Sequence, residues 1–301
     1  MVRQFKVILT GLSNAGKTSI LSVLDRQFHK LSGLVPTRGI IRSVSNVLKM
    51  NIIRWDLGGQ EQYRKDYLSP ESNALVESSL IIFVIDVQDE DTYDKAIEYY
   101  DNLLKVIKEN DENPYFLICL HKVDPELYDK YKENVKDLMK SFKEKSKGWN
   151  HEIFVTSIFN RSSIIEAFSF GIAQFLPKKK ALDLLLKNFM SDAKQTGEKV
   201  SGTWIWDENS IFLSMVFDDK KTEKNSVIAS MGIIGIVESF EKEGEFRSLM
   251  LEINKEYQFL VIKVGKIYTA IVGKNVDFEK IWKLYDEQYL TNLEEIIEKE
   301  E

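Results

Sequence analysis

The sequence predicts an α/β domain with a mostly parallel sheet over residues 1–177, followed by a smaller α+β domain over residues 178–301. In the first part, short apolar runs alternate with amphipathic helical segments, which is the pattern of strands and crossover helices. A glycine-rich motif lies between the first apolar run and the first helix. After residue 177 the strands come in pairs joined by tight turns, which is typical of an antiparallel sheet.

The elements of the first domain are predicted from periodicity. Continuous apolar runs are typical of buried parallel strands, and helical segments carry their apolar residues on one face. The predicted strands are residues 5–9, 41–49, 51–57, 80–86, 115–120 and 153–157, with a tight turn near Met50. The predicted helices are residues 19–24, 91–110, 125–147 and 163–176, the last of which is stopped by Pro177.

The second domain has the predicted order αββαβββα. Its expected helices are residues 181–195, 224–243 and 277–297. Its expected strands are residues 200–206, 210–217, 246–254, 257–264 and 267–272, with turns at 207–209, Lys255-Glu256 and Gly265-Lys266. We expect Lys178-Lys179-Lys180 to be a solvated hinge, with a weak contact to anionic lipid as the alternative. The acidic residues 294–301 are expected to be a frayed helix end.

Residues 11–18 match the pattern G-x-x-x-x-G-K-[ST] of a phosphate-binding loop. A loop that leaves a strand and opens a helix directs backbone N–H groups and the positive helix end at one place, which suits a polyphosphate. Lys17 would reach the β- and γ-phosphates, and the Thr18 hydroxyl would bind Mg²⁺. The residues expected to bind the nucleotide here are Gly11, Ser13, Asn14, Ala15, Gly16, Lys17, Thr18 and Ser19.

Four further residues are expected to act on the γ-phosphate or on its metal ion. Asp56 ends a strand and is placed to hold Mg²⁺, together with Thr18. Gly59 has no side chain, so its N–H can approach a γ-phosphate, and the Gln60 amide can orient the attacking water as the catalytic residue. Thr37 is the expected switch residue, because its hydroxyl would bind Mg²⁺ only while the γ-phosphate is present.

A second set of residues is expected to read the base. Asp124 would accept hydrogen bonds from N1 and N2 of guanine and would reject adenine, which offers no such donors. The stem of Lys122 can lie over the base, and His121 can donate one hydrogen bond to it or can have a structural role alone. Ser157 and Ile158 would supply backbone N–H groups to the guanine O6. The expected ligands are therefore GTP or GDP with Mg²⁺.

Composition limits the class of protein. The net charge of −6 over 301 residues argues against nucleic acid as a partner. Cys119 lies in an apolar run and is expected to be a buried core residue, which fits a reducing interior. No apolar run reaches the roughly 18 residues that span a bilayer, and the N-terminus has no apolar signal segment. We expect a cytoplasmic protein without direct membrane insertion, whose residence at a membrane would come through partners.

These motifs resemble the Ras-related GTPase superfamily over residues 1–177. The run Trp55-Asp56-Leu57-Gly58-Gly59-Gln60 is similar to both Arf and Rag proteins, and Pro36-Thr37 followed by Gly39 is Arf-like. The bulky Ser13-Asn14, and His121-Lys122-Val123-Asp124 with Thr156-Ser157-Ile158, resemble Rag (Gtr) GTPases, in which His replaces Asn. The resemblance implies a P-loop NTPase (Ras-like) fold and, over residues 181–297, a roadblock or longin-like domain.

The resemblance also implies a dimer through the C-terminal domain. In the helix over residues 224–243, Gly232, Gly235 and Ser239 form a small-residue stripe that would let another helix approach. Val227, Met231 and Ile234 lie on one side, and Ile233, Ile236, Val237 and Phe240 lie on another. The partner could be a second copy or a different chain. The alternative is a helix that is fully buried within a monomer.

We expect a GTP/GDP switch that hydrolyses GTP slowly and needs a GTPase-activating protein. No arginine is placed by known spacing to stabilise the γ-phosphate, although Arg38 is adjacent to Thr37. The alternative is a scaffold that holds nucleotide with little or no hydrolysis and recruits partners through its second domain. The presence of Lys17, Thr18, Thr37 and Gln60 argues against a scaffold, and Asp124 argues against an ATPase.

Overall fold

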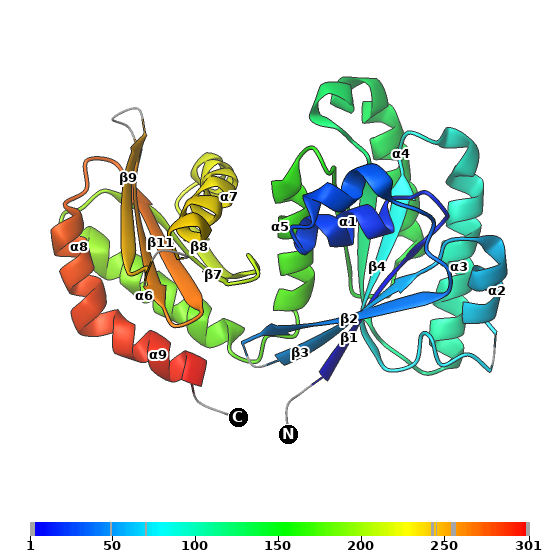
Figure 1. The fold of residues 1–301 in the computed structure, drawn as a ribbon, viewed down its shortest axis with the longest axis horizontal. Coiled ribbons are helices and arrows are strands. Elements are labelled where there is room, and N and C mark those ends of the chain that lie inside the picture. Colours follow the sequence, from blue (N-terminus) through cyan, green and yellow to red (C-terminus); the bar gives the residue numbers. More distant parts are fainter. Residues whose placement is uncertain are drawn as a thin grey trace. The chain divides into compact units, whose positions relative to one another are not determined.

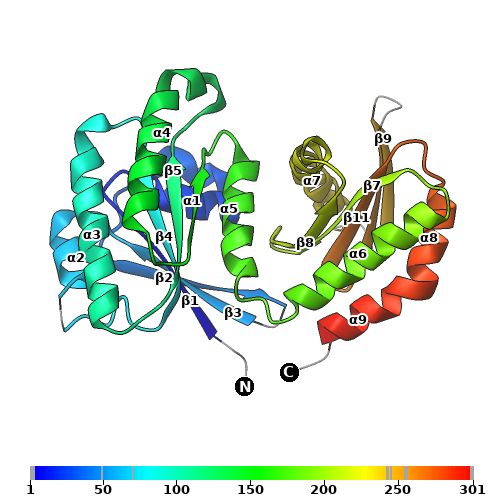
Figure 2. The same cartoon turned by 180° about the vertical axis from the view of Figure 1, so that it is seen from behind.

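A computed structural model of the chain describes residues 4–48, 50–69, 71–241, 244, 246–253 and 257–298. The chain divides into two compact units, Met1–Phe175 and Leu176–Glu301, each with its own sheet (Figures 1 and 2). Among the residues that the structure describes, no helix is long and apolar enough to cross a membrane.

The first unit contains a six-stranded, mostly parallel sheet, so the predicted fold class is confirmed. Its strands are β1 (Gln4–Gly11), β2 (Ile40–Val47), β3 (Met50–Leu57), β4 (Ser78–Asp86), β5 (Tyr115–His121) and β6 (His151–Val155). The strand order is β2-β3-β1-β4-β5-β6, and only the β2–β3 pair is antiparallel. Because the carboxyl ends of parallel strands meet at one edge, the loops after β1, β3, β4, β5 and β6 gather there.

Helices cover both faces of this sheet (Figures 1 and 2). One face carries α1 (Lys17–Leu24) and α5 (Arg161–Ala173), and the other carries α2 (Glu61–Tyr67), α3 (Tyr93–Glu109) and α4 (Tyr128–Lys145). Short 3₁₀ turns at Phe28–Gly33, Glu90–Thr92 and Pro125–Leu127 add to them. The sequence reading contained neither α2 nor the turn at Phe28–Gly33, because segments of six or seven residues are too short to show a helical period.

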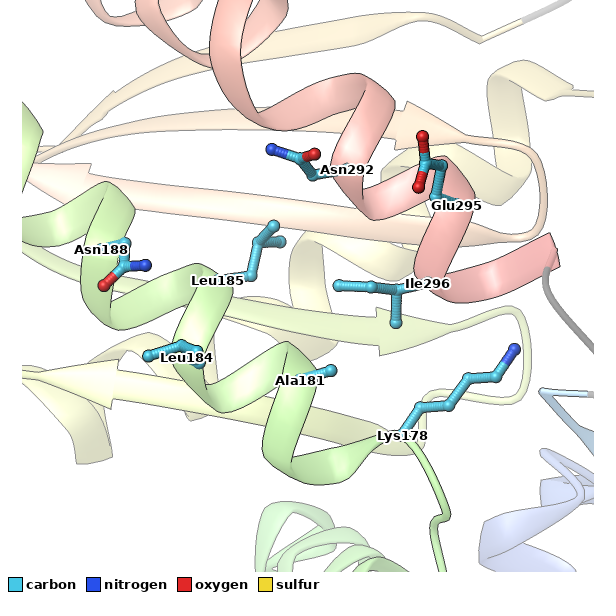
Figure 3. A pocket seen from close by; sticks show the side chains of 8 residues that line it. All are labelled: Lys178, Ala181, Leu184, Leu185, Asn188, Asn292, Glu295 and Ile296. Atoms are coloured by element: carbon cyan, nitrogen blue, oxygen red, sulfur yellow. The ribbon is translucent and has the colours of Figure 1, made fainter. Parts of the chain in front are cut away.

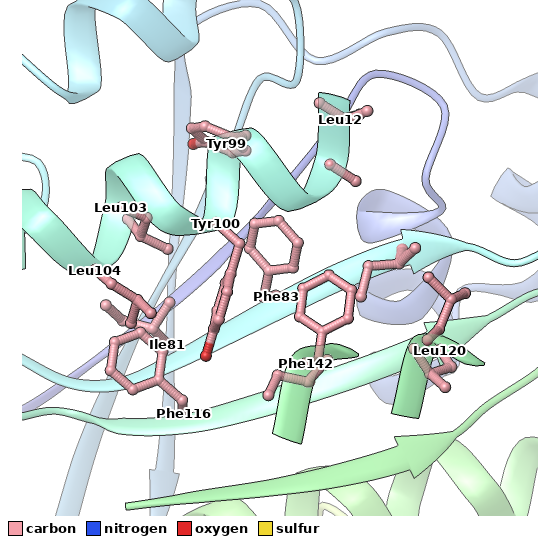
Figure 4. Packing of buried hydrophobic residues seen from close by; sticks show 14 of the residues in the cluster. Leu12, Ile81, Phe83, Tyr99, Tyr100, Leu103, Leu104, Phe116, Leu120 and Phe142 are labelled. Carbon is pink, nitrogen blue, oxygen red and sulfur yellow. The ribbon is translucent and has the colours of Figure 1, made fainter. Parts of the chain in front are cut away.

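The hydrophobic core under α3 and α4 fixes the strands that lead to the candidate site. The rings of Phe83, Tyr100 and Phe142 pack together, with centroids 4.9 Å apart for Phe83–Tyr100 and 5.1 Å apart for Tyr100–Phe142 (Figure 4). All three side chains are fully buried. Burial of such a side chain contributes roughly 1.5–3 kcal/mol. The core thereby holds β4 and β5, whose ends carry polar residues of the site.

The second unit has the predicted order αββαβββα. Its elements are α6 (Lys179–Gln195), β7 (Val200–Asp207), β8 (Phe212–Phe217), α7 (Lys220–Glu241), β9 (Ser248–Ile253), β10 (Tyr257–Val264), β11 (Ile267–Gly273), α8 (Phe278–Tyr285) and α9 (Thr291–Glu298). The strand order is β8-β7-β11-β10-β9, and every neighbouring pair is antiparallel. Helices α6, α8 and α9 cover one face of the sheet, and α7 covers the other (Figures 1 and 2).

Two expectations for this unit were wrong in detail. Lys179 and Lys180 are the first residues of α6 and not part of a hinge, and Lys179 pairs with Asp183 one helical turn later at 2.9 Å. The single predicted last helix contains a π-helical turn at Asp286–Leu290 between α8 and α9. The predicted turn Lys255-Glu256, residues 242–243, 254 and 299–301, and the side chain of Met231 lie outside the described residues.

A mostly apolar hollow of about 420 Å³ lies between α6 and α9 (Figure 3). Its lining includes the apolar side chains of Leu184, Leu185 and Ile296 and the charged side chains of Lys178 and Glu295. It contains none of the predicted site residues, all of which belong to the first unit.

Candidate nucleotide-binding site

The phosphate loop joins β1 to α1, and two of its glycines are required by close contacts. Gly11 has φ 140°, and a Cβ atom there would lie 2.2 Å from the Val84 carbonyl oxygen. Gly16 has φ 99° and precedes the first residue of α1. A Cβ atom on Gly16 would lie 2.3 Å from Cδ2 of His121. Side chains are thus excluded from both positions by neighbouring strands of the protein itself.

Lys17 is buried at the start of α1 and folds back over the loop. Its ammonium group donates hydrogen bonds to the carbonyl oxygens of Gly11 at 3.1 Å and Leu12 at 2.8 Å. Burial lowers the pKa of Lys17 to about 8, the charge of Asp56 opposes that shift, and the charge of Arg64 adds to it. A poorly solvated cation at this position favours the binding of an anion.

Three oxygen-bearing side chains from separate segments converge beside the loop. The hydroxyls of Thr18 and Thr37 donate to Oδ2 of Asp56 at 2.8 Å and 3.0 Å, and the two hydroxyl oxygens lie 2.9 Å apart. Burial raises the pKa of Asp56, while the hydrogen bond from Thr18 and the charge of Lys17 lower it. Oδ1 of Asp56 is buried and accepts no hydrogen bond from any residue that the structure describes.

This cluster fits a small divalent cation. Its donors are hydroxyl and carboxylate oxygens, which are the ligands that Mg²⁺ prefers. Oδ1 of Asp56 has no hydrogen-bond partner among the described residues, so protein groups offset the burial of this carboxylate only in part. The described residues contain no cluster of three or more His, Cys, Asp or Glu side chains, so a metal here would complete its coordination with hydroxyls, water and ligand oxygens.

The segment after β3 lies against the phosphate loop. A Cβ atom on Gly59 would lie 2.4 Å from the carbonyl oxygen of Leu12 and from the amide nitrogen of Ser13, so only glycine fits there. Gln60 follows in an extended conformation as the N-cap residue of α2 and is half-buried. Its Oε1 accepts a hydrogen bond of 3.4 Å from Nε2 of Gln62.

The two candidate switch segments are also in contact with each other. The backbone N–H of Gly58 donates to the carbonyl oxygen of Gly39 at 2.9 Å, and the Tyr67 hydroxyl donates to the same oxygen at 2.8 Å. A Cβ atom on Gly58 would lie 2.6 Å from the carbonyl oxygen of Thr37. The two segments are therefore joined by direct contacts.

Sequence reasoning missed Arg64 in this region. Its Nε donates to the carbonyl oxygen of Gly59 at 3.0 Å, and its guanidinium lies 5.0 Å from the ring centroid of Tyr99. The side chain therefore fixes the peptide between Gly59 and Gln60. A signal existed in the sequence, since Arg64 follows Gln60 by four residues and would share its face of a helix.

The segment after β5 holds the candidate base-reading residues. Oδ1 of Asp124 accepts a hydrogen bond from the Ser157 hydroxyl at 2.5 Å. The ammonium group of Lys122 lies 2.7 Å from Oδ2 of Asp86, and Lys122 has φ 64°. The backbone N–H of Ser157, which was expected to bind a base oxygen, donates to the Ser163 hydroxyl at 3.2 Å. The carboxylate that would select guanine is thus already oriented by a side chain from the loop after β6.

His121 lies deep in the site and supports the loops around it. Nδ1 of His121 lies 2.9 Å from the Thr156 hydroxyl, and the ring is in contact with Gly16. Burial, reinforced by the charge of Lys122, lowers the pKa of His121 to about 3, so the imidazole is neutral near pH 7. The structural role that sequence reasoning left open is therefore the one that these contacts favour.

The contacts join all the predicted segments into one site. Gly16 meets His121, Gly59 meets the phosphate loop, and Thr37 bonds to Asp56. Ser13 and Asn14 are exposed at the tip of the loop, and Ser19 is half-buried in α1. Ile158 is half-buried in the loop that follows Ser157.

The chain is similar to known proteins over a large part of its length. Residues 6–234 match the family model described as "Gtr1/RagA G protein conserved region". The chain is similar to Ras-related GTP-binding protein B of Rattus norvegicus, with 27% identity over 221 residues covering 61% of this chain and 57% of that protein. It is similar to GTP-binding protein GTR1 of Saccharomyces cerevisiae, with 26% identity over 194 residues covering 61% of each. The matches thus span 57% and 61% of these relatives' own length.

A solved structure is similar at a lower level. It is the Arl6 BBS3 small GTPase from Trypanosoma brucei with bound nucleotide analogue GppNp, with 19% identity and a TM-score of 0.41. The match covers 56% of this chain and 94% of that one.

Proposed function

The chain belongs to the Gtr1/RagA family of G proteins, and on that premise we propose that it is a switch that binds GTP or GDP with Mg²⁺ and hydrolyses GTP slowly. The observation that carries the proposal is the convergence of Thr18, Thr37 and Asp56 within hydrogen-bonding distance. Thr18 belongs to the phosphate loop, whereas Thr37 lies in the loop before β2, 19 residues later in the sequence. A site that joins these two segments can report whether a γ-phosphate is present.

Thr18, Thr37 and Asp56 would hold Mg²⁺, which would neutralise phosphate charge when it is bound. The chain's own residues supply the rest of the site. Lys17 would exchange its carbonyl partners for phosphate oxygens, and Gly59 would bring its N–H close to the terminal phosphate. Gln60 would orient the attacking water through its amide. Loss of the γ-phosphate would release Thr37, and the contact of Gly58 with Gly39 would pass the change to α2.

Slow hydrolysis is proposed because the arginine near the candidate phosphate site is held by other contacts. Arg64 donates to the Gly59 carbonyl and its guanidinium lies over the ring of Tyr99. It therefore supports the backbone at Gly59 and is not directed at a phosphate. An arginine supplied by an activating protein typically adds about 10³–10⁵ in rate. We therefore propose that a GTPase-activating protein acts on this chain.

The test is to identify the nucleotide that copurifies with the protein by HPLC and then to measure single-turnover hydrolysis. The proposal predicts a guanine nucleotide and a slow rate that depends on Mg²⁺. Adenine nucleotide, or fast turnover by the protein alone, would contradict it.

The second unit supports a proposal of dimerisation through α7. Ile228, Ile236 and Phe240 are exposed, and nothing lies within 4 Å of a Cβ atom on Gly232 or Gly235. These positions share one face of α7, while Val227, Ile233 and Val237 are buried on the other side. An apolar face beside a stripe of glycines suits the close approach of another helix. The partner would be a second copy of this chain or a related chain.

Light scattering at micromolar concentration tests this interface. Phe240→Glu should shift a dimer towards monomer, because it would place a charge in the apolar face. Leu184→Glu is the matched control, since Leu184 is similarly exposed on α6 on the opposite side of the sheet. A wild-type protein that is strictly monomeric with GTP and with GDP would contradict the homodimer.

A further inference from the structure

Gln88 is a polar residue beside the candidate base site that belongs to none of the sequence motifs. It lies two residues beyond the end of β4 and is half-buried. Nε2 of Gln88 donates to the carbonyl oxygen of Lys122 at 2.6 Å and to Oδ2 of Asp124 at 3.2 Å. Both amide hydrogens are therefore directed at the segment that carries the base-reading carboxylate.

The segment that carries Gln88 is itself tied to this loop. The backbone N–H of Gln88 donates to Oδ1 of Asp86 at 2.9 Å, and the other oxygen of Asp86 lies 2.7 Å from the ammonium group of Lys122. Lys122 has φ 64°, a conformation that few residues other than glycine adopt without support. The end of β4 thus supports the turn between His121 and Asp124 through both backbone and side-chain contacts.

The Asp124 carboxylate keeps acceptor positions that the contacts with Ser157 and Gln88 do not use. An ionised carboxylate offers about four acceptor positions, two on each oxygen. The Ser157 hydroxyl uses one position on Oδ1, and the Gln88 amide uses one on Oδ2. One position remains on each oxygen, which matches the two donors that guanine presents at N1 and at its 2-amino group.

We propose that Gln88 is a positioning residue for base specificity, and this inference rests on the proposed guanine-nucleotide binding. Ser157 alone would leave the Asp124 carboxylate able to rotate about a single hydrogen bond. The second bond from Gln88 fixes the carboxylate plane, so both remaining acceptor positions face the base together. Gln88 therefore acts through Asp124 to require two donors from the ligand instead of one.

The replacement Gln88→Met tests this role, because it keeps the length of the side chain and removes both N–H donors. Hypoxanthine nucleotide is the matched probe, since IDP differs from GDP only by the absence of the 2-amino group. In the wild type, GDP should bind about 10- to 100-fold more tightly than IDP, which is the range for a hydrogen bond to a charged group. In Gln88→Met this ratio should fall to about 2, with the IDP affinity changed by less than about 3-fold.

A second variant and a control make the result decisive. Gln88→Glu removes the donors and adds a like charge beside Asp124, so it should lower the GDP affinity further than Gln88→Met. Gln174→Met changes an exposed glutamine that donates within its own helix, to the Phe170 carbonyl oxygen, and should keep the wild-type ratio.

The outcomes separate this inference from the proposed function. If Gln88→Met and Gln88→Glu bind GDP and IDP with the wild-type ratio, or lose affinity for both equally, the positioning role is overturned while guanine binding stands. If the wild-type protein itself binds ADP as tightly as GDP, the proposed function fails and this inference fails with it.

Discussion

A Cβ atom added at Gly16 would lie 2.3 Å from Cδ2 of His121, so the phosphate loop and the base-reading segment are in direct contact. The neutral imidazole fills the space that a side chain at Gly16 would need. The hydrogen bond from its other side to Thr156 at 2.9 Å extends the contact to the loop after β6. The buried ring of His121 therefore connects the phosphate loop, its own segment after β5 and the loop after β6.

Replacement of Gly16 by Ala should disrupt nucleotide binding through this contact. The new methyl group would force the loop or the ring to move, and a residue at φ 99° is strained in any case. We expect a loss of about 100-fold or more in GDP affinity and a decrease of roughly 1–3 kcal/mol in the free energy of unfolding. Equilibrium titration and urea unfolding measure the two effects.

Two variants serve as controls for that prediction. Gly33→Ala should have little effect, because nothing lies within 4 Å of a Cβ atom there. The double variant Gly16→Ala/His121→Ala should recover part of the lost affinity, since it removes the atoms that the methyl group meets. Absence of any recovery would show that backbone strain, and not the imidazole, excludes a side chain at Gly16.

His121 should make the stability of the protein depend on pH. Its folded-state pKa of about 3 lies below the ordinary 6.5, so only the unfolded chain takes up this proton between those values. The contribution of the neutral ring is therefore present above pH 6.5 and is lost as the pH falls. It should amount to about 2 kcal/mol between pH 7 and pH 5. In His121→Asn the fall in unfolding free energy over this range should be smaller by that amount, and an equal fall in both proteins would refute the assignment.

Gln60→Leu should slow hydrolysis without preventing binding. The leucine side chain has a similar size but cannot orient water through an amide. We expect single-turnover hydrolysis of GTP to fall by about 10- to 100-fold, with the GTP affinity changed by less than about 2-fold. The matched control is Gln174→Leu, which changes an exposed glutamine that donates to the Phe170 carbonyl oxygen and should keep the wild-type rate. Equal rates in wild type and Gln60→Leu would remove Gln60 from the chemistry.

Asp207 should destabilise the second unit as the pH rises. Burial raises the pKa of Asp207 from 3.8 to about 6, and hydrogen bonds from Asn209 and Ile211 offset part of that shift. Between these values the folded state holds a proton that the unfolded state has released, so the free energy of unfolding decreases with rising pH. The slope is at most about 1.4 kcal/mol per pH unit. Relative to wild type, Asp207→Asn should therefore become more stable from pH 4 to pH 6 in chemical denaturation. A constant difference between the two proteins would contradict the assignment.

The sequence was sufficient for the architecture and for the residues that carry the motifs. Alternating apolar runs and helical periods place β1, β4 and β5, and their ends place Gly11, Asp86 and His121 at one edge. The convergence of Thr18, Thr37 and Asp56 could be anticipated from motif order alone. The role of Gln88 could not, because it depends on a hydrogen bond between segments distant in the sequence.

His121 shows the limit of a residue-by-residue reading. Its sequence position predicts a group beside the base, and its chemistry allows a hydrogen-bond donor there. Whether the ring faces a ligand or a neighbouring loop is decided by packing against Gly16, and packing has no local sequence signal. The hinge expected at Lys178-Lys179-Lys180 is a different case, because Asp183 follows Lys179 by four residues and their pairing at the start of α6 has a local sequence signal.

The most direct test of guanine recognition is to change the base that the site accepts. Asn at position 124 would present one donor and one acceptor, which suits xanthine, where an oxygen replaces the 2-amino group of guanine. Wild-type protein should bind GDP about 100-fold or more tightly than XDP, and Asp124→Asn should reverse that preference. Equilibrium titration of both nucleotides against both proteins gives the answer. An Asp124→Asn protein that binds GDP with wild-type affinity would contradict the account.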